Sequence, residues 1–114
     1  MKFTDTLKKN YEFQRLYSKG KSAVTPYLVV YVRKTRKRTN RIGITVSTKL
    51  GKAVVRNRVR RRLREIYRLA EDSFLPGTEL VVVARVKAVK ASYSQLEKAF
   101  MSACAKLEVL REEK

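Results

Sequence analysis

Arginines are concentrated in the middle of the chain in a pattern that suits phosphate binding. Residues 49–68 read KLGKAVVRNRVRRRLREIYR. Because successive helical residues are rotated by about 100°, Asn57, Arg61, Arg64 and Arg68 would share one face of a helix. A planar guanidinium group forks onto phosphate oxygens and stacks on bases. An amide such as Asn57 can also contact a base edge or a ribose hydroxyl. The segment therefore predicts a helix whose exposed face binds nucleic acid.

The predicted contacts extend to the neighbours of this row. Arg56 and Arg58 flank the first turn, and Arg60 lies beside the row. Gly51 precedes the helix and leaves its first N–H groups free, so the helix dipole and these donors favour a phosphate there. We call the predicted group the arginine set: Lys52, Arg56, Asn57, Arg58, Arg60, Arg61, Arg64 and Arg68.

Aromatic side chains form a second group with possible binding chemistry. Phe13 and Tyr17 are spaced by one helical turn, and Tyr27 and Tyr31 alternate along an expected strand beside Arg33. Aromatic rings on an open sheet face between cations can stack the bases of single-stranded RNA, at roughly 1–3 kcal/mol per base. An aromatic pair one turn apart is more often packing than ligand contact, so the residues alone leave both interpretations open.

The chain offers little for a protein active site. It has no histidine for acid–base catalysis, no evident nucleophile with a base, and no paired carboxylates. The single cysteine, Cys104, excludes an intrachain disulfide and suits a reducing compartment such as the cytoplasm. Zinc sites of the usual ligands cannot be assembled, although carboxylates and water could hold Mg²⁺. We therefore expect any reaction chemistry to reside in a partner.

The charge of the chain is strongly positive and unevenly placed. The formal net charge is +18, and residues 13–64 contain 17 of the 28 Lys and Arg residues but no Asp or Glu. Such a field repels itself, so a polyanionic partner is expected. Nucleic acid is the first candidate and an anionic membrane surface the second. A basic surface that serves only solubility is a third interpretation.

Hydrophobic patterns predict the elements that position these residues. Helices are expected over residues 6–19, 53–71 and from 92 onward, and strands over residues 27–33, 41–47 and 78–86. The first two strands each have one apolar side, as in an antiparallel sheet that helices cover on one face only. The third is almost wholly apolar and is expected at the sheet centre. The pattern indicates one α+β domain over residues 1–114, ordered helix, two or three strands, helix, strand, helix.

The central motif resembles that of a known family. The run GKAVVRNRVRRRLRE, centred on Arg56-Asn57-Arg58, resembles the signature of the protein subunit of bacterial ribonuclease P. LKKNYEFQRLYSKG resembles the opening helix of that family and LVVVARVKA its last strand, so the likeness covers nearly the whole chain. One departure is Thr48, where many members have a second basic residue. The resemblance implies an α/β sandwich similar to a ribosomal-protein domain, with a left-handed β-α-β crossover.

The resemblance also implies a function. Members of the family assist a catalytic RNA that, with bound Mg²⁺, removes the 5′ leader from precursor tRNA, and they can broaden its range of substrates. The arginine set would bind the catalytic RNA, and the leader would lie in a cleft between the first helix and the sheet. The implied leader contacts are Phe13, Tyr17, Tyr31, Arg33, Thr45, Ser47, Lys49 and Arg85. The implied partners are the RNA subunit and precursor tRNA, with Mg²⁺ held mainly by RNA and no small-molecule substrate.

Two other classes stay open at this point. A ribosomal or other structural RNA-binding protein would share the charge, and it would co-purify with ribosomes. A cationic protein of the membrane surface would need an exposed apolar face beside its charges. The apolar side chains of the arginine-rich segment, Val55, Val59, Leu63, Ile66 and Ala70, recur at steps of three and four and are expected to face the core instead.

Overall fold

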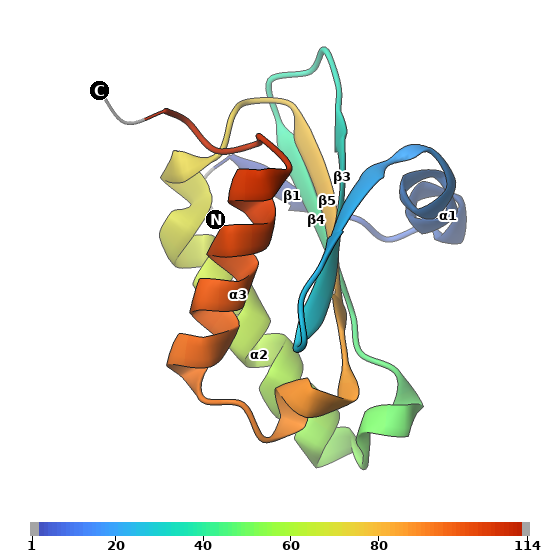
Figure 1. Ribbon diagram of the computed structural model, residues 1–114. Helices are drawn as coiled ribbons and strands as arrows, with labels where there is room; N and C mark the ends of the chain where they lie inside the picture. Colours follow the sequence, from blue (N-terminus) through green and yellow to red (C-terminus); the bar gives the residue numbers. More distant parts are fainter. Residues whose placement is uncertain (1–2, 113–114) are drawn as a thin grey trace.

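The chain folds into a five-stranded sheet with helices on both faces, as a computed structural model shows for residues 3–112, the part of the chain that it describes (Figure 1). The strand order in the sheet is β1-β4-β5-β3-β2. Along the chain the elements are β1 (Thr4–Thr6), α1 (Asn10–Lys19), β2 (Lys21–Val24), β3 (Leu28–Lys34), β4 (Asn40–Thr45), α2 (Ala53–Ala70), β5 (Thr78–Ala84) and α3 (Tyr93–Lys106). Short 3₁₀ turns occupy Thr48–Leu50, Glu71–Ser73 and Val86–Val89.

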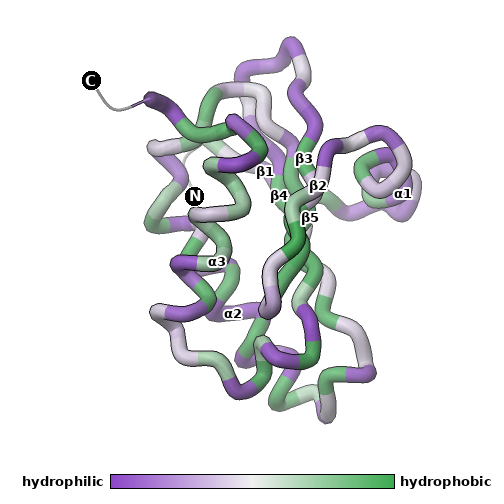
Figure 2. Tube along the Cα trace, viewed as in Figure 1, coloured by the Kyte–Doolittle hydropathy of each residue, from purple (hydrophilic) through white to green (hydrophobic). Residues whose placement is uncertain are grey.

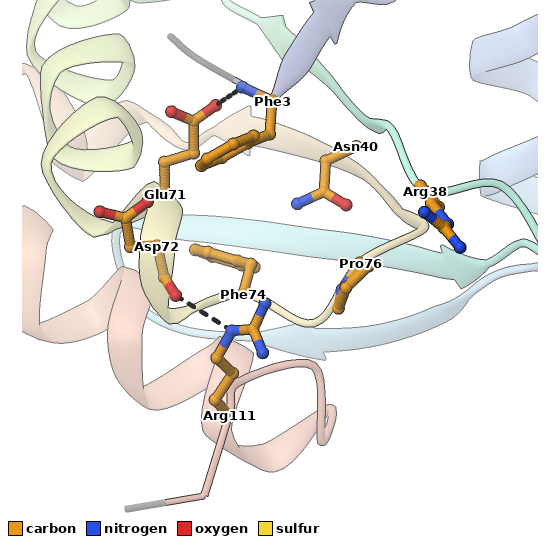
Figure 3. A pocket seen from close by; sticks show the side chains of 8 residues that line it. All are labelled: Phe3, Arg38, Asn40, Glu71, Asp72, Phe74, Pro76 and Arg111. Atoms are coloured by element: carbon orange, nitrogen blue, oxygen red, sulfur yellow. Dashed lines mark hydrogen bonds between the residues drawn. The ribbon is translucent and has the colours of Figure 1, made fainter.

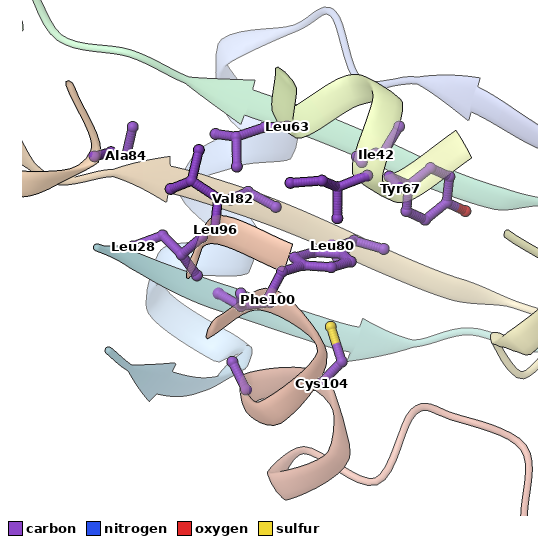
Figure 4. Packing of buried hydrophobic residues seen from close by; sticks show 14 of the residues in the cluster. Leu28, Ile42, Leu63, Tyr67, Leu80, Val82, Ala84, Leu96, Phe100 and Cys104 are labelled. Atoms are coloured by element: carbon purple, nitrogen blue, oxygen red, sulfur yellow. The ribbon is translucent and has the colours of Figure 1, made fainter. Parts of the chain in front are cut away.

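The main core lies between the sheet and the pair α2 and α3 (Figure 4). As predicted, Val59, Leu63 and Ile66 of α2 are buried there. Tyr67 is buried as well, and its ring lies 5.1 Å from that of Phe74. Full burial of a Val, Leu or Ile side chain stabilises a fold by roughly 1.5–3 kcal/mol. The apolar stripe of α2 is therefore committed to the core, which leaves the arginines to face outward.

The second face of the sheet is covered in part by α1. Leu7, Leu16 and Val81 are buried in a separate cluster on this side, with Val83 packed against it. The expectation that helices cover one face only is therefore wrong. Its cause lies in β5, which runs through the middle of the sheet and is apolar at every position from Leu80 to Ala84, as its colour in Figure 2 shows. A strand that is buried on both faces needs a covering layer on each.

The sheet is mixed rather than antiparallel. β3 is antiparallel to β5 and to β2, whereas β4 is parallel to both β5 and β1. In Figure 1, β4 and β5 run downward with β5 in front, and α2 returns upward on the left, so this β-α-β crossover is left-handed, as the resemblance implies. Because β4 and β5 are parallel, the segments that follow them emerge at the same end of the sheet, next to the start of α2.

The first helix begins four residues later than predicted. Thr6 belongs to β1, which pairs with β4, and Leu7 is buried beyond it. Lys9 has an extended backbone, and its N–H donates to Glu12 Oε1 at 3.2 Å, which marks the true start of the helix at Asn10. Pairing with a distant strand thus overrides the local helical pattern. The predicted end of the helix at Gly20 is confirmed.

The last helix begins as its sequence predicts. Ser92 is the N-cap: its Oγ accepts from the Gln95 N–H at 3.1 Å, and the Ser92 N–H donates to Gln95 Oε1 at 2.9 Å. Near the other end of α3, Cys104 is free and buried in the core. Burial raises the pKa of its thiol to about 12. This thiol is therefore packing rather than chemistry.

Candidate nucleic-acid interface

The outward face of α2 presents the arginine set to solvent. Asn57, Arg58, Arg61 and Arg64 are exposed, and Arg60 is half-buried. The Arg60 guanidinium donates to Asn57 Oδ1 at 3.0 Å, so these two side chains support each other. Among the described residues, no carboxylate lies within ion-pair distance of Arg58, Arg61 or Arg64. Their charges are therefore available to an anionic partner.

Arg68 at the far end of this face differs from the others. Its guanidinium binds the Glu65 carboxylate with two hydrogen bonds, of 3.0 Å from Nε and 2.5 Å from a terminal nitrogen. The bond from Arg68 is the main cause that holds the pKa of Glu65 below its ordinary value. Arg68 was predicted to bind RNA with the rest of the set, but its charge is already paired. We expect it to contribute least.

The start of α2 lies at the end of the sheet where β4 ends. Ser47, Lys49 and Lys52 are all exposed in this short connection, and Leu50 anchors it in the core. Ser47 Oγ accepts from the Lys49 N–H at 3.2 Å. Lys52 is the N-cap, and its ammonium group cannot accept a hydrogen bond from the first turn. The first turn of α2 therefore has no side-chain cap from Lys52, and its free N–H groups beside a lysine favour a phosphate.

The aromatic residues of α1 lie directly on the sheet. The rings of Tyr17 and Tyr31 meet edge to face, with centroids 5.0 Å apart, and the Tyr17 hydroxyl is 3.1 Å from Thr45 Oγ1. Phe13 covers Gly43, where an added Cβ would come within 2.5 Å of the Phe13 ring. Phe13, Tyr17 and Tyr31, which we call the aromatic platform, are therefore packed and partly exposed at once. Gly43 was not singled out from the sequence, although a glycine inside an alternating strand indicates a close approach.

The two predicted sets adjoin. One hollow between α1, β4 and α2 is lined by Phe13 of the aromatic platform and by Arg60 and Arg64 of the arginine set. Its other lining residues are Thr6, Leu7, Ile42 and Ile44. The paired part of β1 ends opposite Ile42, so it does not cover this part of β4. A single nucleic-acid partner, or two in contact, could therefore reach both surfaces without a gap.

Two cations within residues 13–64, the stretch without Asp or Glu, have counter-charges in the folded chain. Arg33 lies 3.2 Å from Glu79 of β5, and Arg41 pairs with Glu12 of α1 and lies 4.0 Å from Glu79. The expectation of an unneutralised field is therefore wrong for Arg33 and Arg41, because folding brings acids from outside the stretch against them. Arg33 was predicted as a leader contact, and it is tied into this network on the α1 side of the sheet.

Two further predicted positions lie near the turn between β2 and β3. Tyr27 precedes β3 and packs, half-buried, against the main core, so its predicted place on the open face is wrong. Arg85 is exposed just after β5, and its guanidinium donates to the Thr25 carbonyl at 2.8 Å. Arg85 therefore stays at the end of the sheet shared with Ser47 and Lys49.

A further hollow, of about 600 Å³, lies elsewhere, and none of the predicted site residues line it (Figure 3). Two hydrogen bonds beside this hollow tie the ends of the described chain to the turn that follows α2. The Phe3 N–H donates to Glu71 Oε2 at 3.0 Å, and Arg111 Nε donates to the Asp72 carbonyl at 3.2 Å. Its lining is Phe3, Arg38, Asn40, Glu71, Asp72, Phe74, Pro76 and Arg111.

Within residues 3–112, no group of three or more His, Cys, Asp or Glu residues lies close enough to hold a metal ion. No helix in this range has the length and apolar character needed to cross a membrane.

Glu12 makes the docking of α1 sensitive to acid. Burial alone would raise the pKa of its carboxyl, but hydrogen bonds from the Lys9 N–H and from Arg41, together with the charge of Arg41, outweigh burial and lower this pKa. A lowered folded-state pKa stabilises the fold above the unfolded-state value, and this stabilisation is lost as the pH falls through the folded value. We expect the free energy of unfolding to fall below about pH 4 and to depend less on pH in Glu12→Gln.

Urea unfolding followed at a series of pH values measures this effect. Glu97→Gln is the matched control, because Glu97 is an exposed carboxylate in α3. Identical pH profiles for the two variants would contradict the stabilising role of the Glu12 carboxylate.

Comparison with known proteins gives a consistent result. The family model described as Ribonuclease P matches residues 1–108. The chain is 39% identical to the ribonuclease P protein component of Natranaerobius thermophilus over 93% of its own length and 92% of that protein. Its fold matches a solved structure of the Staphylococcus aureus RNase P protein with a TM-score of 0.85 and 33% identity, covering 93% of this chain and 97% of that one. The Thermotoga maritima RNase P protein matches with a TM-score of 0.79 and 29% identity, covering 96% of this chain and 99% of that one.

Proposed function

Because the chain belongs to the ribonuclease P protein component family, and so to the protein part of an RNA–protein endonuclease, we propose that it holds two RNAs side by side. The arginine set binds the catalytic RNA, and the aromatic platform binds the 5′ leader of precursor tRNA. The observation that carries this proposal is the shared hollow, which Phe13, Arg60 and Arg64 line together. Two adjoining surfaces of different chemistry suit two RNAs that must be in contact during cleavage.

The arginine set acts by electrostatics. Arg58, Arg61 and Arg64 are exposed and have no carboxylate beside them in the described part of the chain, so they can displace counterions from phosphates of folded RNA. Holding the set on the rigid helix α2, whose other side is buried, fixes the spacing of these charges. The protein thereby screens the repulsion between the catalytic RNA and its RNA substrate.

The aromatic platform supplies the preference for precursor. Tyr17 and Tyr31 are held by each other and by Thr45, so they offer preformed edges and faces to unpaired bases. Mature tRNA lacks the leader and cannot use these contacts. Binding energy from the platform therefore favours substrate over product, which helps product to leave.

The chemistry is proposed to belong to the RNA. The described residues contain no cluster of carboxylates that could hold a metal ion, and the exposed face of α2 is cationic, so it does not attract one. Mg²⁺ held mainly by the RNA supplies the activation of water for cleavage. The protein side chains bind and orient the two RNAs and hold the leader close to the arginine set.

The test is multiple-turnover cleavage of precursor tRNA at low Mg²⁺, with and without the protein. We expect the protein to raise the rate at low Mg²⁺ and to matter much less at high Mg²⁺, where the ions themselves screen the phosphates. Sequencing the RNA that co-purifies with the protein from cells identifies the partner independently. Equal rates with and without protein would overturn the proposal, and co-purification with ribosomal RNA alone would favour a structural RNA-binding role.

A further inference from the structure

A continuous groove surrounds the turn between β2 and β3 and extends along α3, beginning next to the connection that carries Lys49 and Lys52. Two hollows of about 510 and 380 Å³ share Tyr27 and Gln95 in their lining. A third, smaller one shares Val86 and Lys87 with the first and Pro26 with the second. The groove thus runs from the segment after β5, past Tyr27, to the outer side of α3. The two larger hollows fall in the range of roughly 300–1,000 Å³ that accommodates ligands.

The lining of this groove is cationic. Its charged residues are Arg85, Lys87, Lys90, Lys98 and Lys106, and no Asp or Glu lines any of the three hollows. Glu97 of α3 is exposed and does not line any of the three hollows. Such an arrangement favours a polyanion over an acidic side chain or a neutral ligand.

Apolar and aromatic surface is interleaved with these cations. Val86 is 65% exposed and Val24 is 62% exposed, and both line the groove beside Tyr27. Exposed apolar side chains next to lysines match the two halves of a nucleotide, because bases pack on the first and phosphates pair with the second. An anion without a base would leave the apolar part of the groove unused.

The wall of the groove is preorganised. In the turn before β3, Thr25 Oγ1 donates to the Leu28 carbonyl at 2.8 Å and accepts from the Tyr27 N–H at 3.2 Å. Arg85 then ties the turn to the end of β5: its N–H donates to the Tyr27 carbonyl at 2.9 Å, and its guanidinium donates to the Thr25 carbonyl at 2.8 Å. Binding here would order few additional groups, which lowers its entropic cost.

We propose that this groove binds a second stretch of single-stranded RNA, the part of a long leader that extends beyond the aromatic platform. The inference rests on the proposed function. Arg85 connects the proposed leader path to the groove, because it follows β5 at the end of the sheet and also lines the groove. A short leader would end on the platform. A long leader would continue past Arg85 and Tyr27 toward Lys98 and Lys106.

The experiment compares holoenzyme complexes with precursor tRNAs whose leaders have about 5 and about 15 nucleotides, within the site sizes of single-strand binders. The salt dependence of affinity should be steeper for the long leader, by about 0.7 in log K against log salt for each added phosphate contact. The variant Lys98→Ala with Lys106→Ala should reduce the slope for the long leader by about 1.4 and leave the short one unchanged. Both lysines are exposed on α3, so the fold is expected to tolerate the change.

A matched control removes the same charge elsewhere. Lys34→Ala with Lys37→Ala changes two exposed lysines at the opposite end of the sheet and should affect neither leader selectively. A photoreactive thiouridine near the far end of the long leader should crosslink to peptides that contain Tyr27 or Lys98.

The outcomes separate the two proposals. Equal salt slopes for long and short leaders, or an equal loss for both in the α3 variant, overturn the groove but not the platform. Precursor that binds no better than mature tRNA overturns the proposed function itself. Loss of binding to anionic phospholipid vesicles in the same variant, without a leader-length effect, would assign the groove to a membrane surface instead.

Discussion

Replacing Phe13 and Tyr31 together with alanine is expected to weaken binding of precursor tRNA by about 30-fold or more and to leave mature tRNA binding nearly unchanged. The physical reason is that each ring offers a stacking surface that only the leader can use. Phe13 packs over Gly43 and Tyr31 against Tyr17, so both rings are held in place before RNA arrives. Equilibrium binding of the two tRNAs to the holoenzyme measures the difference.

Tyr17→Phe is the control for this experiment. It removes only the hydroxyl that meets Thr45 Oγ1 at 3.1 Å and keeps the ring, so precursor binding should change little. Because Phe13 also helps to dock α1, urea unfolding of the double variant must confirm that it remains folded under the binding conditions. Equal losses for precursor and mature tRNA in a folded variant would remove the platform from the leader path.

Replacing Arg61 and Arg64 together with alanine is expected to weaken binding of the catalytic RNA and to flatten its salt dependence. If each guanidinium neutralises one phosphate, the slope of log K against log salt should fall by about 1.4 to 1.8. Both side chains are exposed, and the described residues place no carboxylate within ion-pair distance of either. Titration of the RNA subunit at several salt concentrations gives the slope.

The matched comparison is Arg64→Ala against Arg68→Ala. The two arginines lie one turn apart on the same helix and differ in that Glu65 binds the guanidinium of Arg68. Arg64→Ala should therefore cost more affinity than Arg68→Ala. A larger effect at Arg68 would show that Glu65 releases it to the RNA, and that the free structure does not report which charges are available.

Long elements could be predicted from the sequence, whereas short ones could not. The boundaries of α2 and the central place of β5 follow from apolar patterns long enough to repeat. β1 has three residues and β2 has four, too few for a period, and each belongs to the sheet only because a distant strand accepts it. The left-handed sense of the crossover came from the family resemblance, since right-handed connections are the default for a β-α-β unit.

In the candidate site, too, local periodicity could be predicted from the sequence, whereas contacts between distant segments could not. Asn57, Arg61, Arg64 and Arg68 share the outward face of α2 because helical periodicity alone fixes that geometry. The counter-charges of Arg33 and Arg41 were not foreseen, because Glu79 and Glu12 reach them only through the register of β5 and the docking of α1. Tyr27 was misplaced because it lies in the turn before β3, where strand alternation no longer determines the direction of a side chain.

The buried thiol of Cys104 has a practical consequence for following this protein in solution. It is the only cysteine of the chain, and both its complete burial and its high pKa protect it from maleimide reagents. A cysteine introduced at the exposed Lys37, in the loop between β3 and β4 and far from the start of α2, would be the one reactive handle. A fluorescent dye placed there could report assembly by energy transfer without a cysteine-free background.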